Sequence, residues 1–117
     1  MRISVSVWED KVSPVLDTAA KLLIVDNENQ RESRFEAYLP EQDISQRCMF
    51  IRSLDVQVLI CGAVSRHLSR MIEATGIKII SGISGPAEDV LKAYLQGNLF
   101  QERFLMPGRK FNHREQK

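Results

Sequence analysis

Residues able to bind an anion or a metal gather in three short loops of this sequence, each of which follows a segment typical of a β-strand. Loop 1 spans residues 9–17, loop 2 residues 61–65 and loop 3 residues 81–86. If the preceding strands are parallel neighbours, all three loops lie at the carboxyl edge of one sheet. Open α/β sheets bind their ligands at that edge. We therefore expect a binding site where the three loops meet.

Loop 3 contains Gly82 and Gly85 and opens into a helix at Pro86. The backbone N–H groups and the dipole at such a helix start attract anions. The loop has neither the lysine of a P-loop nor the full GxGxxG pattern, which argues against a nucleotide site. A glycine-permitted turn without a ligand is the alternative interpretation.

Loop 2 begins with Cys61 and Gly62 and also opens into a helix. Ser65 is the predicted N-cap, and Arg66 and His67 follow in the first turn. The imidazole there is a metal ligand, an acid–base group or simply a solvated side chain. It is not the base of a nucleophilic serine, because helical neighbours two positions apart do not face each other.

Loop 1 carries two acids, Asp10 and Asp17, and a Ser13–Pro14 turn. A metal-dependent nuclease needs carboxylates that hold two ions across a phosphate, and we expect them on central strands. The predicted strands at 3–7 and 56–60 contain no acid, so a hydrolase is the least favoured interpretation. We expect Asp17 to order the loop by accepting hydrogen bonds from backbone N–H groups. Nothing in the sequence indicates an enzyme.

The two cysteines, Cys48 and Cys61, have neither CxxC spacing nor a histidine at zinc-finger spacing. Both lie among apolar residues, so two reduced, buried thiols are the simplest interpretation. One falls within a predicted helix and the other at the end of a strand, so we expect no disulfide between them.

The composition is that of a soluble globular domain. The chain has 117 residues, of which 44% are apolar and 26% charged, and its formal net charge is +1. This small charge argues against a protein that coats nucleic acid in general, since such a protein needs a strongly basic field. No apolar run reaches the ~20 residues of a membrane span. The alternating N-terminal segment lacks a signal-peptide core. We expect a cytoplasmic protein.

Hydrophobic patterning predicts how the loops are positioned. Alternation predicts antiparallel strands near 3–7, 20–26 and 34–39, and continuous apolar runs predict buried parallel strands at 56–60 and 77–80. Helical spacing predicts three helices, at about 43–54, 65–75 and 86–96. The order βββαβαβα gives an α/β fold of the ribonuclease H-like type, a five-stranded mixed sheet with its first strand central and helices on its faces. We expect one domain at 1–108 and a flexible basic tail at 109–117.

Several of these segments together resemble one known family. They are the opening at 1–19 (MRISVSVWEDKVSPVLDTA) and the segments 59–66, 76–80, 90–99 and 104–108. They are similar to the dinitrogenase iron–molybdenum cofactor biosynthesis family, which includes NifX-like accessory proteins and the C-terminal domain of NifB-like proteins. The usual opening of that family is Ser-Pro-Val-Phe-Asp-x-Ala, and here Leu16 replaces the phenylalanine. Related chains often have a cysteine after Met-Pro-Gly, where this sequence has Arg109.

The resemblance implies a ribonuclease H-like domain without nuclease activity, in an accessory role related to nitrogen fixation. Its better-understood members bind or carry the iron–molybdenum cofactor or its iron–sulfur precursors, and the segment corresponding to loop 1 is implicated in that binding. The expected partners are then proteins that donate or accept a metallocluster.

Our leading hypothesis is a non-catalytic accessory protein that holds an iron–sulfur or iron–molybdenum type cluster, or its precursor, at the sheet edge where the three loops meet. Cys61 is the first candidate metal ligand, followed by His67 and then Cys48. Iron–sulfur clusters favour thiolates, so a partner or an exogenous ligand would supply the rest. The other candidate binding residues are Asp10, Ser13, Pro14, Asp17, Gly62, Ser65, Arg66, Gly82 and Gly85.

The second hypothesis is a regulatory protein-interaction module that binds no cluster. In that case the exposed edge strand at Arg34–Leu39 would pair across a homodimer, because a strand edge presents unpaired backbone groups.

Overall fold

The structure, a computed structural model, describes residues 1–29, 31–39 and 43–107. It is an α/β fold with one mixed sheet and three α-helices. The predicted tail at 109–117, with Arg109, lies outside the described residues. The elements in chain order are β1 (Arg2–Trp8), β2 (Lys11–Val12), η1 (Leu16–Thr18), β3 (Lys21–Glu28), β4 (Arg31–Tyr38), α1 (Ile44–Ser53), β5 (Val58–Ile60), α2 (Arg66–Ala74), β6 (Lys78–Ile80), α3 (Ala87–Leu95) and η2 (Glu102–Phe104).

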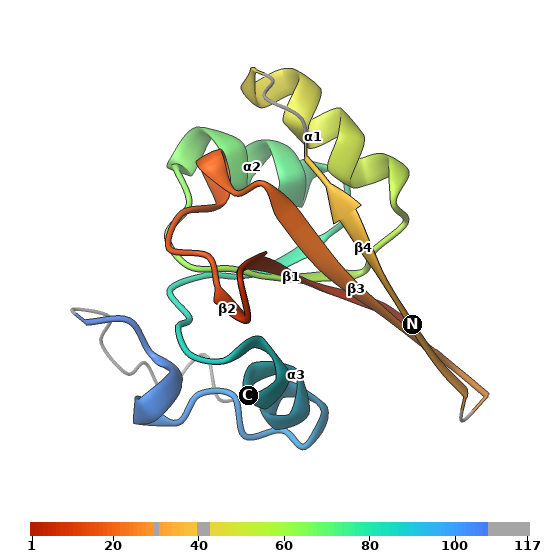
Figure 1. Cartoon of the computed structure of the whole chain (residues 1–117). Helices are drawn as coiled ribbons and strands as arrows, with labels where there is room; N and C mark the ends of the chain where they lie inside the picture. The colour runs from red at the N-terminus through yellow and green to blue at the C-terminus, as the bar shows by residue number, and fades with distance from the viewer. Residues whose placement is uncertain (30, 40–42, 108–117) are drawn as a thin grey trace.

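The sheet has β1 at its centre, as predicted. Its strand order is β4-β3-β1-β5-β6, in which β3 and β4 are antiparallel to their neighbours and β5 and β6 run parallel to β1. The long, twisted β3–β4 hairpin extends away from the helices (Figure 1). The carboxyl ends of β1, β5 and β6 therefore lie at one edge of the sheet.

The predicted number of five strands is wrong, because the described residues form a sheet of six. The extra strand, β2, is two residues long and pairs antiparallel with the end of β1, so that Val7 lies opposite Val12 and Trp8 opposite Lys11. The chain reverses through Glu9, whose φ of 57° is in the left-handed region. A turn built on a residue other than glycine gives no turn signal, so this segment looked like an open loop in the sequence.

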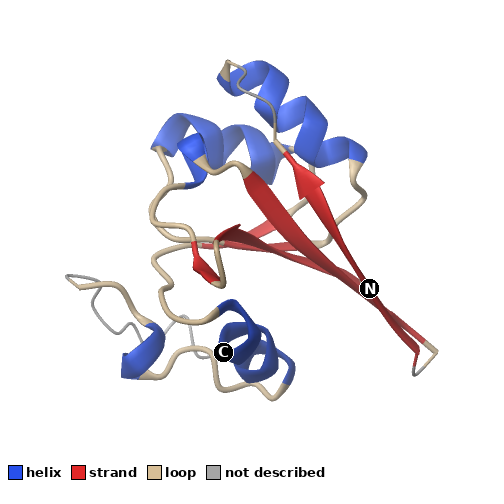
Figure 2. Cartoon of the chain, viewed as in Figure 1, coloured by secondary structure: helices blue, strands red, loops and turns tan. Residues whose placement is uncertain are grey.

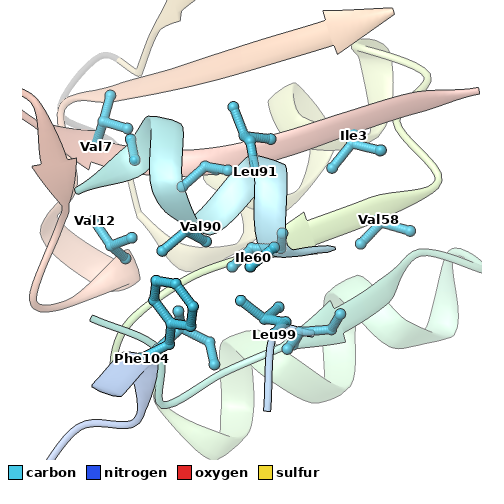
Figure 3. Packing of buried hydrophobic residues seen from close by; sticks show 14 of the residues in the cluster. Ile3, Val7, Val12, Val58, Ile60, Val90, Leu91, Leu99 and Phe104 are labelled. Atoms are coloured by element: carbon cyan, nitrogen blue, oxygen red, sulfur yellow. The ribbon is translucent and has the colours of Figure 1, made fainter. Parts of the chain in front are cut away.

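Two layers of helices enclose the sheet. α1 and α2 cover one face, and α3 covers the other (Figure 2). The core beneath α3 includes Ile3 and Val7 of β1 together with Val90 and Leu91 of α3 (Figure 3). Val5 of β1 belongs to the same cluster. The core beneath α1 and α2 combines the opposite faces of β3 and β5 with helix residues, among them Ile24, Ile51, Leu59, Leu68 and Ile72. The opposite face of β1 instead presents the buried Ser4 and Ser6. Strand alternation thus supplies both cores.

The helices begin where their N-cap residues predict. The Asp43 carboxylate accepts a hydrogen bond from the Gln46 N–H at 2.8 Å, and the Ser65 hydroxyl accepts one from the Leu68 N–H at 3.2 Å. α3 has Pro86 in the N-cap position and two acids, Glu88 and Asp89, in its first turn, which the helix dipole favours. In the described part of the chain, no helix is long and apolar enough to cross a membrane.

Candidate functional site

Loop 1 is folded back over the end of β1. The left-handed conformation of Glu9 costs about 1–2 kcal/mol for a residue that carries a Cβ. The resulting turn lets the Ser13 N–H donate a hydrogen bond to the Ser6 carbonyl at 2.8 Å. The short helix η1 then leads the chain towards β3. Loop 1 is therefore a fixed structure across the edge of the sheet.

Loops 1 and 2 are joined backbone to backbone. The Ala63 N–H donates to the Pro14 carbonyl and the Leu16 N–H donates to the Ala63 carbonyl, both at 2.8 Å. Gly62 lies where the two loops cross. A Cβ built on it would come 2.5 Å from the carbonyl oxygens of both Ser13 and Pro14. Loop 1 thus fills the space beside Gly62. The lack of a side chain at this position allows the two loops to pack against each other.

Loop 3 is joined to loop 2 in the same way. The Gly82 N–H donates to the Gly62 carbonyl at 2.9 Å, and the Ile83 N–H donates to the Cys61 carbonyl at 3.0 Å. Gly82 has a φ of 75°, a conformation that glycine adopts without steric cost. Loop 3 therefore continues the pairing of β5 and β6 beyond the ends of those strands.

Loop 3 also contacts loop 1 directly. The Val12 N–H donates to the Gly85 carbonyl at 2.9 Å, and the Ala87 N–H at the start of α3 donates to the Asp10 carbonyl at 2.8 Å. Gly85 has a φ of 117°. These bonds complete a closed set of contacts among the three loops, which confirms the prediction that they meet at one edge. We call this surface the three-loop edge.

The segment at residues 104–106, where η2 ends and Leu105 forms an isolated bridge with Ile83, is a fourth part of the three-loop edge. The Ser84 N–H donates to the Phe104 carbonyl at 2.7 Å, and the Met106 N–H donates to the Gly82 carbonyl at 2.9 Å. The Phe104 ring is buried and lies 3.6 Å from where a Cβ on Gly85 would be. The helical pattern of the sequence ends before this segment. Its apolar residues are therefore the one feature of the sequence that indicates that it packs against the domain.

Asp17 connects loop 1 to the start of α2. Its carboxylate accepts a hydrogen bond from the backbone N–H of Ser65 at 2.8 Å. The negative charge lies at the positive end of the helix dipole, where it is favourable. The prediction that Asp17 accepts a backbone N–H bond is confirmed, but the donor belongs to loop 2 instead of loop 1.

Cys61 does not face the three-loop edge. Its side chain is fully buried in the core beneath α1 and α2, with Leu16, Leu59 and Leu68 in the same cluster. Burial raises the pKa of its thiol to about 12, and the charge of Asp17 acts in the same direction. Metal ligation needs the thiolate form. Nothing in the structure therefore supports Cys61 as a metal ligand.

The remaining predicted ligands are not brought together. Cys48 is buried within α1, and burial raises the pKa of its thiol as well. Both cysteines are free, as predicted. His67 is exposed in the first turn of α2, beside the exposed Arg66. Among the residues that the structure describes, no three His, Cys, Asp or Glu side chains are grouped to hold a metal ion.

The exposed part of the three-loop edge offers charge and apolar surface instead of soft ligands. Arg66 stands one residue after the N-cap of α2, where its exposed guanidinium favours an anion. Trp8 at the end of β1 is 60% exposed, an unusual position for a tryptophan. The other exposed residues of the loops are Glu9, Asp10, Lys11, Pro14, Val15, Ala63, Ser65 and Pro86.

Two clefts lie away from the three-loop edge. One, of about 400 Å³, is bounded by β4 and α3 and lined in part by Arg34, Glu88 and Leu95. The other is an open depression of about 720 Å³ at the turn between β3 and β4, lined mainly by polar and charged residues. No residue of the three loops lines either cleft, so neither of them extends the three-loop edge.

The comparisons with known proteins identify a family and a fold. A family model described as "Dinitrogenase iron-molybdenum cofactor" matches residues 1–97. No curated protein matches significantly.

Three solved structures resemble the whole fold. The crystal structure of PH0822 covers 87% of this chain and 95% of its own, with 21% identity and a TM-score of 0.79. The apo form of the orange protein from Desulfovibrio gigas covers 89% and 94%, with 19% identity and a TM-score of 0.68. The Thermotoga protein TM1290, assigned to the DUF35 family, covers 83% and 89%, with 22% identity and a TM-score of 0.64. At these identities the likeness concerns the fold.

Proposed function

The chain belongs to the dinitrogenase iron–molybdenum cofactor family, and from that membership we propose that it is a small accessory protein that binds or carries a metallocluster. The cargo would be an iron–sulfur or iron–molybdenum type cluster or its precursor. The observation that carries the proposal is the three-loop edge, where loops 1, 2 and 3 of the matched region are hydrogen-bonded into one surface. Proteins that donate or accept the cluster would be its partners.

We further propose that the chain holds its cargo without coordinating it through its own thiolates. Both cysteines are buried, and burial keeps their thiols protonated by raising their pKa values. An anionic cluster that brings its own ligands would instead be attracted by the guanidinium of Arg66, beside the helix start that the Asp17 carboxylate already caps. Loop 1, through Asp17 and Ser13, and loop 3, through Gly82 and Gly85, would give this surface its shape.

Several finer features belong to the same proposal. The strand order and the central parallel pairing support a ribonuclease H-like fold, once β2 is set aside. The absence of acids on β1 and β5 supports a role without catalysis. Two free cysteines are in keeping with a reducing, cytoplasmic location. The functional domain would end near residue 108, since the segment at 104–106 completes the three-loop edge.

A second candidate function is a regulatory protein-interaction module that binds no cluster. It is favoured by the lack of a metal-holding group of side chains among the described residues. The exposed Trp8, beside the three loops, would then contact a protein partner, because exposed aromatic residues are enriched at such interfaces.

Anaerobic reconstitution separates the two candidates. The chain is incubated with iron and sulfide, with and without molybdate, then desalted and measured by absorption spectroscopy and metal analysis. Our proposal expects retained metal and visible absorption, both severalfold lower in Arg66→Glu. The matched control is Arg70→Glu, which changes an exposed arginine one helical turn further along α2 and should behave as the wild type.

Replacement of the buried cysteine tests how the cargo is held. Cys61→Ala should retain the same metal content per folded chain, because its thiol does not reach the surface. A wild-type chain that retains no metal under any of these conditions would reject the carrier function and leave the interaction module. Metal that is lost in Cys61→Ala while the variant stays folded would show direct ligation and reject the proposed mode of binding.

A further inference from the structure

The outer edge of β4 is an eight-residue strand edge with no described neighbour. Every residue of β4 except Ala37 is exposed, including Phe35 at 40% and Tyr38 at 68%. An exposed strand of this length is a template for pairing with another strand. The question is which strand its side chains fit.

The backbone hydrogen bonds between β3 and β4 determine which residues of β4 direct their N–H and C=O groups to the free edge. The Leu39 N–H donates to the Ala20 carbonyl at 2.8 Å, in the same register that pairs Lys21 with Tyr38. Hydrogen-bonded pairs alternate along an antiparallel ladder. The odd-numbered residues of β4 therefore bond to β3. The N–H and C=O groups of the even-numbered residues point to the free edge, at Glu32, Arg34, Glu36 and Tyr38.

This alternation restricts how β4 could pair with β4 of a second copy. A hydrogen-bonded pair needs outward groups on both strands, so an even-numbered residue must lie opposite another even-numbered residue. In a symmetric antiparallel pair, one residue then lies opposite itself on the two-fold axis. Registers whose axis passes between two residues are excluded.

Charge and overlap distinguish the remaining registers. With Arg34 opposite itself, arginine meets arginine and Glu32 meets Glu36, so every charged pair of that face is repulsive. With Glu36 opposite itself, two carboxylates meet and the overlap is confined to residues 34–38. With Ser33 opposite itself, the charges are compatible but the overlap is confined to residues 31–35. The register with Phe35 opposite itself has neither pairs of like charge nor so short an overlap.

We propose that a second copy of this chain pairs antiparallel with β4, with Phe35 opposite Phe35 on the two-fold axis. Arg34 of each copy then lies opposite Glu36 of the other, and Glu32 lies opposite Tyr38. The overlap covers residues 32–38. The two phenylalanines occupy the non-hydrogen-bonded position, where paired side chains approach most closely. The two sheets become one continuous sheet.

The charged residues of this interface are already held in position within one copy. The Arg34 guanidinium bonds to Glu88 at 2.5 and 2.6 Å and to Glu32 at 3.0 Å, and Lys21 Nζ lies 2.8 Å from a Glu36 oxygen. Arg34 and Glu36 thus lie on the same face of the sheet, the one that α3 covers. The pairing is independent of the cluster proposal, since it uses neither the three-loop edge nor a metal.

Sedimentation analysis with charge variants tests the interface. The wild-type chain should show a mass that rises towards that of a dimer with concentration. Arg34→Glu alone brings acid opposite acid, Glu36→Arg alone brings arginine opposite arginine, and each should weaken dimerisation roughly tenfold or more. An equal mixture of the two variants restores both opposite-charge pairs and should dimerise again. Arg70→Glu, an equivalent charge change on α2, should leave the mass unchanged.

Disulfide trapping tests the register. Phe35→Cys places a thiol opposite its own copy on the axis and should form a covalent dimer under mild oxidation, whereas Ser33→Cys should not. The native cysteines are buried and do not compete. A wild-type chain that remains monomeric at every accessible concentration would overturn the proposal. So would a dimer unaffected by both charge variants, or one in which Ser33→Cys cross-links and Phe35→Cys does not. Circular dichroism of each variant verifies that it is folded.

Discussion

The carboxylate of Asp17 and the backbone N–H of Ser65 are 2.8 Å apart, although 48 residues separate them in the chain. This bond joins the end of loop 1 to the first residue before α2. It also brings a negative charge towards the buried Cys61, whose pKa it helps to raise. One side chain thus connects the loop structure, the helix start and the chemistry of the nearby thiol.

Replacement of Asp17 by alanine should lower the free energy of unfolding by about 0.5–1.5 kcal/mol, because the exposed Ser65 N–H exchanges its acceptor for water. Asp17→Asn keeps an acceptor oxygen and should lose less. Asp10→Ala is the control, since its side chain is exposed and its contact with Ala87 uses the backbone carbonyl. Chemical denaturation measures all three. A loss in Asp10→Ala equal to that in Asp17→Ala would contradict the assigned role of Asp17.

Replacement of Gly62 by alanine should lower the free energy of unfolding by more than about 3 kcal/mol, because the new Cβ would overlap the backbone of loop 1. Gly97→Ala provides the comparison. That glycine has a φ of 77° and open space around it, so alanine there costs about 1–2 kcal/mol of backbone strain alone. Thermal and urea unfolding measure both variants. Similar losses would mean that loops 1 and 2 do not cross as closely as described.

The burial of Cys61 predicts a dependence of stability on alkaline pH. The thiol pKa rises from the ordinary 9.0 to about 12 on folding. Above pH 9 the unfolded chain loses this proton and the folded chain keeps it. Stability should therefore be complete below pH 9 and fall between pH 9 and 12, by up to ~1.4 kcal/mol per pH unit.

Comparison with Cys61→Ala isolates this effect from other groups that titrate in the same range. Urea unfolding from pH 7.5 to 10.5 should show a steeper decline in the wild type than in the variant, so that their difference in stability narrows as the pH rises. Parallel curves would indicate that Cys61 is accessible to water in the folded protein.

Two serines of β1 should respond in opposite ways to the loss of their hydroxyls. Ser4 and Ser6 are both fully buried, but Ser4 donates a hydrogen bond to the Val58 carbonyl at 3.0 Å, whereas the Ser6 hydroxyl has no partner among the described residues. Ser4→Ala should cost about 1 kcal/mol, and Ser6→Ala should be neutral or stabilising. Denaturation midpoints measured side by side provide the check. A greater loss in Ser6→Ala would reveal a bond that Ser6 makes elsewhere.

Removal of residues 109–117 should leave the thermal midpoint within a few degrees of that of the full chain. The reason is that the described core already ends with the buried Phe104 and the bond from Met106 to Gly82. Truncation before residue 104 is the contrasting variant, because it removes the segment that binds loop 3. A large drop in the first truncation would move the domain boundary beyond residue 108.

The sequence predicted the order of the main elements because each local signal agreed with the fold. Alternation in β1, continuous apolar runs in β5 and β6, and the caps Asp43 and Ser65 all indicate the structure that forms. The convergence of the three loops followed from strand topology alone. β4 begins earlier than predicted, at Arg31 instead of Arg34, because edge strands tolerate the charged residues that argue against a strand elsewhere.

The candidate site was less predictable because it depends on which way side chains point. A strand buried on both faces is apolar at every position, so the run at 56–60 gives no sign of the face that Cys61 joins. The crowding at Gly62 comes from Ser13 and Pro14, nearly 50 residues earlier in the chain. Only the folded structure reveals such contacts between distant segments. It also places Cys61, a candidate metal ligand, in the core.

The central place of β1 has a consequence for how the chain is completed. β1 can pair with β3 soon after both are synthesised, because β3 follows closely in sequence. Its other side can pair only after β5 at residues 58–60 has been synthesised. The hydrogen-bond partners of loop 1 at Gly85 and Ala87 are synthesised later still. Those of loop 3, in the segment at 104–106, are synthesised last. During synthesis from the N-terminus, the β1–β3–β4 meander therefore has partners long before the three-loop edge does. A nascent chain that ends before about residue 106 cannot close that edge, so any cargo or partner that recognises it meets a chain in which all three loops and the segment at 104–106 have been made.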